Sequence, residues 1–448
     1  MSSAPPAASI GIDFGTSNTV IALATGDGRV ETLRFEHGGT LHSVYASALC
    51  FWQDRLGSSL PPGAEGGPWA IERFMEGESA LRFIQSFKTF AASRSFQSTT
   101  IFRQKFQFED LLAAFLRTLV RHAGAGLDLS GARVNIGRPV RFSGSNPDEA
   151  LAMQRYREAF GRLGIRHSSY VYEPVGAAFS FARNLDRDAT VLVADFGGGT
   201  SDFSIMRFSR DGGGVLRAEP LGHAGIGIAG DTFDARIVDH VVSPRLGKGG
   251  SYRSFGKVLP LPVHYFVTLA RWNELALMKG SADLRELREL ARAAIDPAPL
   301  HDFITLVEHD LGFSLYRAVS AAKVALSTRD SVDFRFADGA LDIRATITRP
   351  DFESWISDDL ARIATTVDQV LAKSGITAGE VEKVFLTGGT SFVPAVQRLF
   401  AERFGEGKLT AADQFESIAQ GLALIGLTGE PDQWAVAAAL PPEVSTRV

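Results

Sequence analysis

Two short segments of the sequence combine a carboxylate, glycines and hydroxyl side chains in the same order. The first is Asp13-Phe14-Gly15-Thr16-Ser17-Asn18, and the second is Asp195-Phe196-Gly197-Gly198-Gly199-Thr200. In each, an aspartate follows a mainly apolar run, a pattern typical of a strand that enters a tight turn. Glycine lets a ligand approach the backbone, and successive turn N–H groups form an anion-binding nest. One copy is equally typical of an ordinary β-turn, but two copies favour a pair of phosphate-binding hairpins.

The two aspartates are candidates for a metal site. Proteins hold Mg²⁺ with one or two carboxylates together with phosphate oxygens and water. Asp13 and Asp195 could therefore hold a hydrated Mg²⁺ jointly. They lie 182 residues apart (13 to 195), which is the size of a domain. This spacing predicts an internal duplication, in which two related α/β lobes each offer one hairpin to a shared cleft.

Two further glycine turns could meet a nucleotide. Gly225-Ile226-Gly227-Ile228-Ala229-Gly230 matches Gly-x-Gly-x-x-Gly and precedes a predicted helix at about 231–242. The βαβ start of a dinucleotide-binding domain is missing before it, so we interpret it as a third phosphate contact at a helix N-terminus. Gly388-Gly389-Thr390 repeats the order of strand, turn and helix, with Pro394 in the first turn of the helix. No Gly-x-x-x-x-Gly-Lys-Ser/Thr run occurs, which excludes a P-loop.

Apolar periodicity predicts the elements that must position these turns. Residues 243–262, rich in glycine and proline, are predicted to be a surface loop, and the tail from Gly429 is predicted to be loose. The other predicted helices are 110–122, 148–163, 282–294, 301–326, 351–373, 394–404 and 415–427. Strands are predicted at 134–140, 215–220, 332–348 and 383–387.

Length and composition narrow the class of protein. A chain of 448 residues exceeds what one hydrophobic core supports, which predicts at least two lobes. A net charge of −5 offers no general attraction for nucleic acid or anionic lipid, so a small molecule or a protein is the expected partner. Cys50 is the only cysteine, which suits a reducing compartment. With no signal peptide and no membrane span apparent, we expect a cytoplasmic protein.

The motifs occur in the order found in DnaK-type chaperones, the heat shock protein seventy family of the actin-like ATPase superfamily. Besides both hairpins and the Gly388 turn, the resemblance is carried by Tyr172–Ala178, Gly230–Asp234 and Lys323–Ser327. Phe87–Phe90, Ile136–Pro139 and Leu221–Gly225 resemble, more narrowly, the short chaperone-like YegD group. The resemblance implies an α/β, actin-like ATPase fold of the ribonuclease H-like class, with two duplicated lobes around a central nucleotide cleft. It also implies binding of ATP or ADP with Mg²⁺, and ATP hydrolysis.

The resemblance further implies roles for individual residues. Lys88 and Glu173 resemble the pair that positions the attacking water, and Asp13 and Asp195 resemble the anchors of Mg²⁺-bound water. The expected nucleotide contacts are Gly15, Thr16, Ser17 and Asn18 in the first hairpin, Gly197, Gly198, Gly199 and Thr200 in the second, Gly230 and Asp231 at the third glycine turn, Lys323 and Ser327 at the ribose, Gly388 and Gly389 at the adenosine turn, and Phe392 beyond it.

The sequence departs from the family around the base. Val324 and Phe392 stand where the chaperones use arginines to sandwich adenine. Ser320 stands in place of a glutamate near the ribose, and Phe415 in place of an aspartate before the last helix. Apolar walls can still stack a purine, but these departures leave the base selectivity open.

We expect lobe I at 10–188 and lobe II at 189–428, with an inserted subdomain at about 235–325 in lobe II. Residues 1–9 are expected to be a disordered tail and 429–448 a loose one. The peptide-binding domain of the chaperones is not expected, because so few residues follow the last helix.

The favoured function is a stand-alone ATPase whose lobes open and close with nucleotide state and so engage or release a protein partner through the surface of lobe II. Two alternatives from the same superfamily stay open. A sugar or small-metabolite kinase would need a carboxylate base near the γ-phosphate and a polar sugar pocket. An actin-like filament protein would need self-complementary lobe faces.

Overall fold

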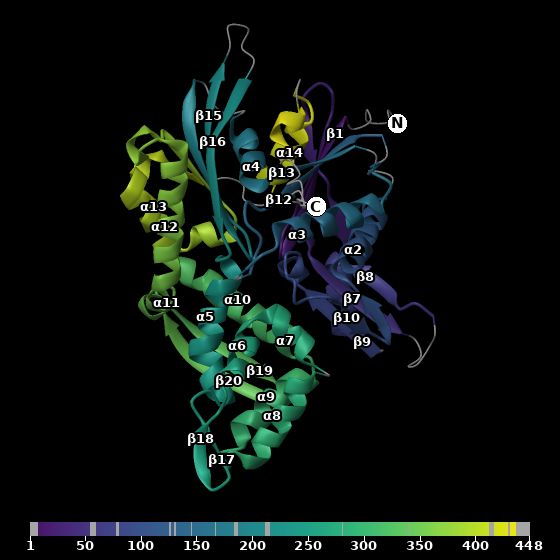
Figure 1. The fold of residues 1–448 in the computed structure, drawn as a ribbon, viewed down its shortest axis with the longest axis vertical. Coiled ribbons are helices and arrows are strands. Elements are labelled where there is room, and N and C mark those ends of the chain that lie inside the picture. The colour runs from purple at the N-terminus through teal and green to yellow at the C-terminus, as the bar shows by residue number, and fades with distance from the viewer. Residues whose placement is uncertain are drawn as a thin grey trace, which may run out of the picture. The chain divides into compact units, whose positions relative to one another are not determined.

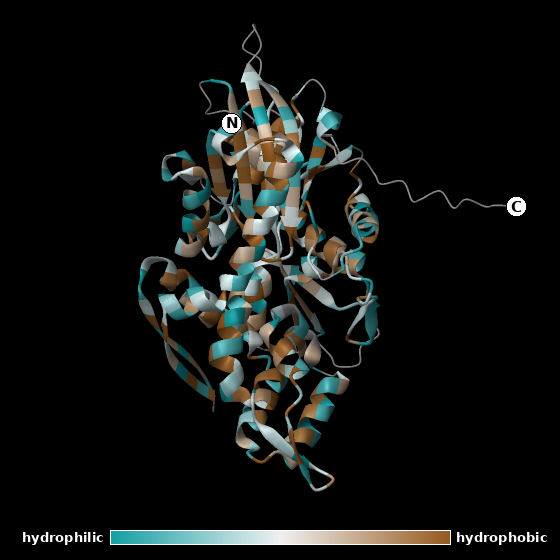
Figure 2. Cartoon of the chain, turned by 60° about the vertical axis from the view of Figure 1, so that its left-hand side comes forward, coloured by the Kyte–Doolittle hydropathy of each residue, from teal (hydrophilic) through white to brown (hydrophobic). Residues whose placement is uncertain are grey.

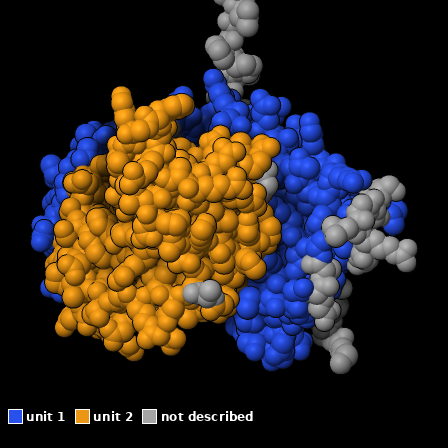
Figure 3. Space-filling view, turned by 90° about the horizontal axis from the view of Figure 1, so that it is seen from below, with its two compact units in different colours: residues 1–227, 365–391, 400–448 blue, residues 228–364, 392–399 orange. Residues whose placement is uncertain are grey.

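The structure is a computed structural model whose contacts divide the chain into two compact units, coloured blue and orange in Figure 3. Unit 1 comprises residues 1–227, 365–391 and 400–448, and unit 2 comprises 228–364 and 392–399. The described residues are 8–53, 60–77, 80–124, 127–129, 131–144, 146–165, 167–182, 187–210, 216–279, 281–339, 341–411, 416–428 and 431–435. Among them, no helix is both long and apolar enough to cross a membrane.

Unit 1 contains two sheets built on the same plan (Figure 1). The first has the order β3 (Val30–Thr32), β2 (Asn18–Ala24), β1 (Ser9–Phe14), β12 (Arg133–Arg138) and β13 (Ser168–Tyr172), and β6 (Tyr45–Ala46) also pairs with β2. The second has the order β16 (Leu216–Ile226), β15 (Ser201–Arg210), β14 (Ala189–Phe196), β21 (Lys383–Thr387) and β22 (Leu409–Ala411). In both sheets the first three strands are antiparallel neighbours and the last three are parallel neighbours. The predicted duplication is therefore confirmed.

The two predicted hairpins have the same register. Asp13 lies opposite Val20 across β1 and β2, and Asp195 lies opposite Asp202 across β14 and β15. In the first four-residue turn the Gly15 N–H donates to the Asn18 carbonyl at 2.9 Å, and in the second the Gly197 N–H donates to the Thr200 carbonyl at 2.9 Å. The two turns thus present their backbone at equivalent ends of two equivalent sheets.

A pair of helices packs against both sheets. Helix α4 (Glu173–Ala182) follows β13, and α14 (Ser417–Ile425) follows β22. A Cβ atom on Gly421 would lie 1.7 Å from the Gly176 carbonyl oxygen, so the two helices touch through their backbones. Only glycine permits this approach. Val171, Val191 and Leu422 lie fully buried in the surrounding core, and the strands of both sheets are largely hydrophobic (brown in Figure 2).

The tail expected to be loose from residue 429 is partly packed. Residues Pro431–Trp434 form a 3₁₀ turn, η8. Trp434 is buried, and its ring meets Phe179 edge-on with centroids 4.9 Å apart. An indole buries a large apolar area, which is sufficient to hold a short turn against a core.

The rest of unit 1 surrounds an aromatic core that contains Phe14, Phe87, Phe115 and Tyr156. Its helices are α1 (Gly67–Glu76), α2 (Phe108–Ala123) and α3 (Glu149–Gly161), and a short 3₁₀ helix, η1, spans Phe87–Phe90. Its further strands are β7 (Ala48–Gln53), β8 (Gly63–Gly66) and β9 (Ala80–Gln85) in one sheet, and the pairs β4 (Phe35–His37) with β5 (Thr40–His42) and β10 (Thr99–Ile101) with β11 (Gln104–Phe106). The helices predicted at 110–122 and 148–163 are confirmed as α2 and α3.

Unit 2 is mainly helical. Its helical segments are α5 (Gly230–Ile237), η3 (Val238–Val242), η4 (Ser243–Leu246), α6 (His264–Ala270), α7 (Trp272–Met278), α8 (Ala282–Ala293), α9 (Ala298–Glu308), α10 (Gly312–Thr328) and α11 (Arg349–Trp355). Its strands are the pairs β17 (Ser251–Ser254) with β18 (Lys257–Pro260) and β19 (Ser331–Asp338) with β20 (Leu341–Thr348). Helices α12 (Ser357–Ser374) and α13 (Pro394–Phe404) have residues in both units.

Three expectations about these segments are wrong. The loop predicted at 243–262 contains the β17–β18 hairpin, whose second strand is exposed along its whole length. The single helix predicted at 301–326 is two helices, because Asp310 between them has a left-handed φ of 55°. The helix predicted at 351–373 is likewise divided, at Ile356.

Candidate functional site

A buried ion pair joins two of the predicted catalytic residues. Glu173 is the first residue of α4, and Lys88 lies in η1. The Lys88 ammonium donates to Glu173 Oε1 at 2.7 Å, and the residues are only 6% and 4% exposed. Burial alone lowers the pKa of Lys88, but the Glu173 carboxylate outweighs it and raises that pKa above the ordinary value. Lys88 is therefore charged at neutral pH.

Three aspartates surround this pair. Burial, and then the Glu173 carboxylate, raise the pKa of Asp13 to about 7. Burial is also the main reason that the pKa of Asp195 is raised well above its usual range, followed by the charges of Glu173 and Asp13. The pKa of Asp202 is raised to about 7 by burial and then by Glu173. The cluster thus holds more negative charge than Lys88 neutralises, which is a setting that a cation stabilises.

Asp202 was missed in the sequence, although the structure places it in the cluster. Its Oδ1 accepts from the backbone N–H groups of Val140 at 2.7 Å and Arg141 at 3.2 Å. Its Oδ2 is buried and accepts no hydrogen bond from the described residues. A signal existed, because the residue seven positions after Asp195 faces it across a four-residue hairpin turn. The first hairpin has Val20 at the equivalent place, so the repeat did not point to it.

The aspartates fit a hydrated Mg²⁺. In the described part of the chain, no three His, Cys, Asp or Glu side chains converge closely enough to hold a metal directly. Mg²⁺ usually keeps several waters and takes one or two carboxylates. The unpartnered Asp202 oxygen and the raised pKa values of Asp13 and Asp195 are what a site for a water-coordinated cation would show.

The two predicted phosphate turns lie side by side. A Cβ atom on Gly199 would lie 2.7 Å from Ser143 Oγ and 3.1 Å from Thr16 Oγ1. It would also lie 3.6 Å from a methyl carbon of Thr89, the neighbour of Lys88. The Ser143 hydroxyl donates to the Gly199 carbonyl at 3.2 Å. The second turn therefore meets both the first turn and the Lys88 segment, although these lie far apart in the sequence.

The predicted adenosine turn is attached to the second hairpin. Gly388 has a left-handed φ of 82°, and a Cβ atom there would lie 2.0 Å from the Phe196 carbonyl oxygen. The Ser391 hydroxyl donates to the Gly388 carbonyl at 2.7 Å, which closes the turn. A Cβ atom on Gly389 would meet nothing within 4 Å, so this glycine faces open space.

Unit 2 holds the remaining candidates. The Lys323 ammonium donates to Asp234 Oδ2 at 2.8 Å and to the Gly230 carbonyl at 3.1 Å. Lys323 is thereby tied to the first turn of α5, where burial and then Asp234 raise the pKa of Asp231 to about 6. Ser327 lies one turn further along α10 and is half-buried.

The residues that depart from the family near the base are less buried. Val324 is 64% exposed and Phe392 is 43% exposed. Ser320 on α10 is half-buried. Phe415 lies outside the described residues. Exposed apolar side chains of this kind can stack on a flat apolar ligand surface.

The chain is similar to proteins of one family. It matches the family described as Hsp70 protein over residues 87–248 and 311–436. It is 26% identical over 433 residues to chaperone protein dnaK3 of Thermosynechococcus vestitus, covering 93% of this chain and 54% of that protein. It is 26% identical over 442 residues to the HscA homologue of Pseudomonas fluorescens, and 26% identical over 435 residues to DnaK of Deinococcus deserti. These matches cover 93% of this chain, and 57% and 59% of those two proteins, so the chain spans little more than half of each relative.

Proposed function

The chain belongs to the Hsp70 family, and from that premise we propose that it binds ATP with Mg²⁺ and hydrolyses the nucleotide, as a chaperone-like switch. Proteins of this family are ATPases. The observation that carries the proposal is the buried pair of Lys88 and Glu173, which lies among three aspartates of raised pKa. Such a cluster is costly to bury, and strongly perturbed acids gather at sites of catalysis or ligand binding.

In this proposal, each group of residues in the site has its own role in binding or hydrolysis. The Gly15–Asn18 and Gly197–Thr200 turns offer backbone N–H groups and hydroxyls to the phosphates. Asp13 and Asp195 would hold the waters of a bound Mg²⁺, which would supply positive charge to neutralise the phosphate oxygens. Glu173 accepts a hydrogen bond from the attacking water and orients it. The Lys88 ammonium faces the negative charge that develops on the transferred phosphoryl group.

Binding of ATP with Mg²⁺ should raise the melting temperature. A ligand that binds only the folded protein stabilises it by mass action, by about 2.7 kcal/mol at about 100 times its Kd. Differential scanning fluorimetry with ATP, with and without Mg²⁺, measures this, and phosphate release measures turnover. Asp195→Asn provides the matched variant, which we expect to lose the dependence on Mg²⁺. An unchanged melting curve at millimolar ATP, with no phosphate released, would sink the proposal.

A protein partner is proposed for the β17–β18 hairpin of unit 2. Phe255 at its tip is fully exposed, and Val258 is 58% exposed. Arg253 and Lys257 flank them, and the sequence from His240 to Asn273 contains no Asp or Glu. Exposed apolar side chains beside positive charge suit a partner with an apolar surface and acidic edges.

The double substitution Phe255→Ser with Val258→Ser tests this surface. Because both side chains project into solvent, we expect unchanged folding and unchanged ATP binding. Partners captured at low salt by the wild-type protein should be lost, and Lys257→Glu should weaken the same capture. Thr346→Ala on β20 is a control away from the hairpin. Recovery of the same proteins by the wild type and by the double variant would refute the assignment.

A further inference from the structure

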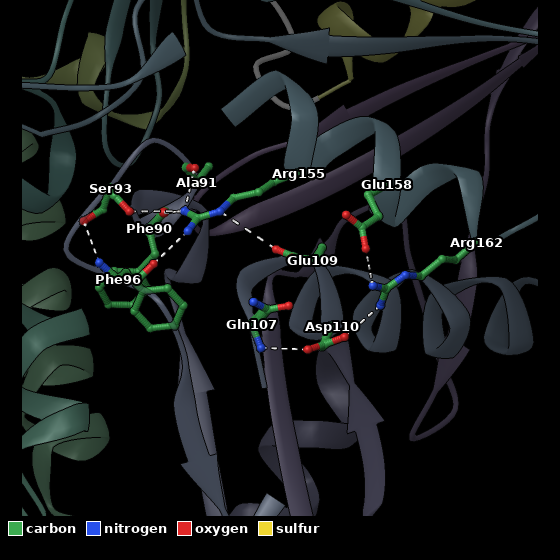
Figure 4. A network of polar contacts seen from close by, with 10 residues as sticks. All are labelled: Phe90, Ala91, Ser93, Phe96, Gln107, Glu109, Asp110, Arg155, Glu158 and Arg162. Atoms are coloured by element: carbon green, nitrogen blue, oxygen red, sulfur yellow. Dashed lines mark hydrogen bonds and ion pairs between the residues drawn. The ribbon is translucent and has the colours of Figure 1, made fainter. Parts of the chain in front are cut away.

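Arg155 on α3 is a buried arginine whose hydrogen bonds go to one short stretch of backbone (Figure 4). Its Nη1 donates to the carbonyls of Phe90, Ala91 and Ser93 at 2.9, 3.0 and 3.2 Å. Its Nη2 donates to the Phe96 carbonyl at 2.7 Å. One guanidinium thus satisfies four carbonyls within seven consecutive residues, 90–96.

This arrangement requires an arginine. The guanidinium is planar, always charged and carries five donors in a fixed fork, whereas a lysine ammonium has three donors on a flexible stem. Arg155 is only 9% exposed, and the Glu109 carboxylate lies 3.8 Å from its Nε. Burying a guanidinium without partners would be strongly unfavourable, so its carbonyl partners must hold their places.

The other contacts within the 90–96 stretch are local: the Phe90 and Phe96 rings stack with centroids 4.5 Å apart, and the Phe96 N–H donates to Ser93 Oγ at 3.3 Å. Residues 91–98 belong to no helix or strand. Helix α3 holds the stretch a second time at its N-terminus, where the Asp148 N–H donates to the Ala92 carbonyl at 2.9 Å and Arg94 pairs with Asp148 at 2.7 Å. Asp148 and Arg155 are seven residues apart and so lie on one face of the helix. The stretch is therefore fastened to α3 at two points.

The 90–96 stretch begins at the last residue of the short helical turn that carries Lys88. Lys88 lies in a single 3₁₀ turn, η1, which is closed by the Ala91 N–H donating to the Lys88 carbonyl at 3.0 Å. On the other side, Ser86 has a left-handed φ of 52°, a conformation that is uncommon for a residue with a side chain. A turn this short has no ladder of its own to fix it, so its position depends on Phe87, which packs in the aromatic core, and on what holds the 90–96 end.

We propose that Arg155 is a positioning residue, which fixes the 90–96 stretch and thereby holds the Lys88 ammonium against Glu173. This inference rests on the proposed ATPase function. Arg155 donates to none of the residues of the two phosphate turns, so its loss should leave nucleotide affinity nearly unchanged. A small displacement of Lys88 in the reacting state is sufficient to slow the chemical step.

The experiment compares Arg155→Lys and Arg155→Ala with Arg162→Gln. Arg162 lies seven residues further on, at the C-terminal end of α3, and bonds Asp110 and Glu158 at 2.8 and 2.6 Å, away from the Lys88 stretch (Figure 4). We expect both Arg155 variants to lower kcat by about tenfold or more with the Kd for ATP within about threefold, a split typical of a transition-state effect. Arg162→Gln should leave both values unchanged. Millimolar guanidinium should restore part of the activity of Arg155→Ala and none of that of Arg155→Lys.

Hydrogen exchange separates this inference from the proposed function, because it needs no turnover. Residues 86–96 should exchange faster in the Arg155 variants than in the wild type or in Arg162→Gln. Unchanged exchange in these residues would overturn the inference that Arg155 fixes the 90–96 stretch. Faster exchange with unchanged kcat in an active protein would overturn the positioning role. Absence of turnover in the wild type would overturn the proposed function and, with it, the catalytic part of this inference.

Discussion

Replacing Glu173 with glutamine is expected to lower the rate of ATP hydrolysis by about 10²–10³-fold while ATP affinity changes only a few-fold. The residue is 4% exposed and its carboxylate accepts from Lys88 at 2.7 Å, so the substitution changes charge in a site that is shielded from water. Glutamine has almost the same shape but is a poor acceptor for the attacking water and for the ammonium. Lys88→Met should have an effect of similar size.

A double variant distinguishes catalysis from folding. Removing one partner of a buried ion pair leaves the other charge uncompensated, which costs about 3–5 kcal/mol of stability. Each single variant should therefore melt at a lower temperature than Lys88→Met with Glu173→Gln, in which both charges are gone. Thermal melting should show that the double variant regains stability. Single-turnover rates, measured together with calorimetric affinities, should show that it stays inactive. If the double variant regained turnover, or if affinity fell in step with rate, the pair would be structural.

The stability of the nucleotide-free protein is expected to fall as the pH rises from about 4 to about 7. Asp13 and Asp202 have a pKa of about 7 in the folded protein against an ordinary 3.8, mainly because both are buried. Between those values the folded state binds more protons than the unfolded state, so stability falls by up to about 1.4 kcal/mol per pH unit for each proton. The contribution is complete below pH 3.8 and is lost as the pH passes 7.

Denaturant unfolding at a series of pH values measures this dependence. Asp202→Asn should flatten it, because the amide cannot lose a proton, whereas Asp358→Asn at the exposed start of α12 should not. Mg²⁺ with ATP competes with the protons, so its stabilising effect should be larger at pH 8 than at pH 6. Stability that is level or rises over this range in the wild type, or an unaltered slope in Asp202→Asn, would contradict the protonation of these aspartates.

The sequence was sufficient to predict the two hairpins, since Asp13 and Asp195 each follow a mainly apolar run and begin a segment that opens with Asp-Phe-Gly. Strand ends and glycine turns are local features, and local features can be read from a single chain. Asp202 faces Asp195 across the second hairpin, but it was missed because the first hairpin has Val20 at the equivalent place and the repeat did not point to it. The contact between Lys88 and Glu173 joins residues 85 positions apart. Their pairing was expected from resemblance, not from spacing.

Other differences between the predicted elements and the structure have causes in the local sequence. The β17–β18 hairpin was taken for a loop because an exposed strand has no buried face, and so lacks the alternation that marks half-buried strands. The break at Asp310 was hidden because helical apolar spacing continues on both sides of it. Trp434 was not expected to pack because it lies in a tail that begins at Gly429 and contains Pro431, Pro441 and Pro442, residues typical of irregular chain.

The backbone contact between Gly176 on α4 and Gly421 on α14 limits how this protein can vary. Elsewhere in a core, a larger residue at one position can be offset by a smaller one at its neighbour. Here no such exchange exists, because nothing is smaller than the glycine already present on each helix. Gly176 stands one turn after Glu173, so sequence drift at the contact would shift the Glu173 carboxylate before it altered either glycine turn. Related chains that retain the carboxylate can be expected to retain both glycines, and to diversify instead at positions such as the exposed hairpin of unit 2.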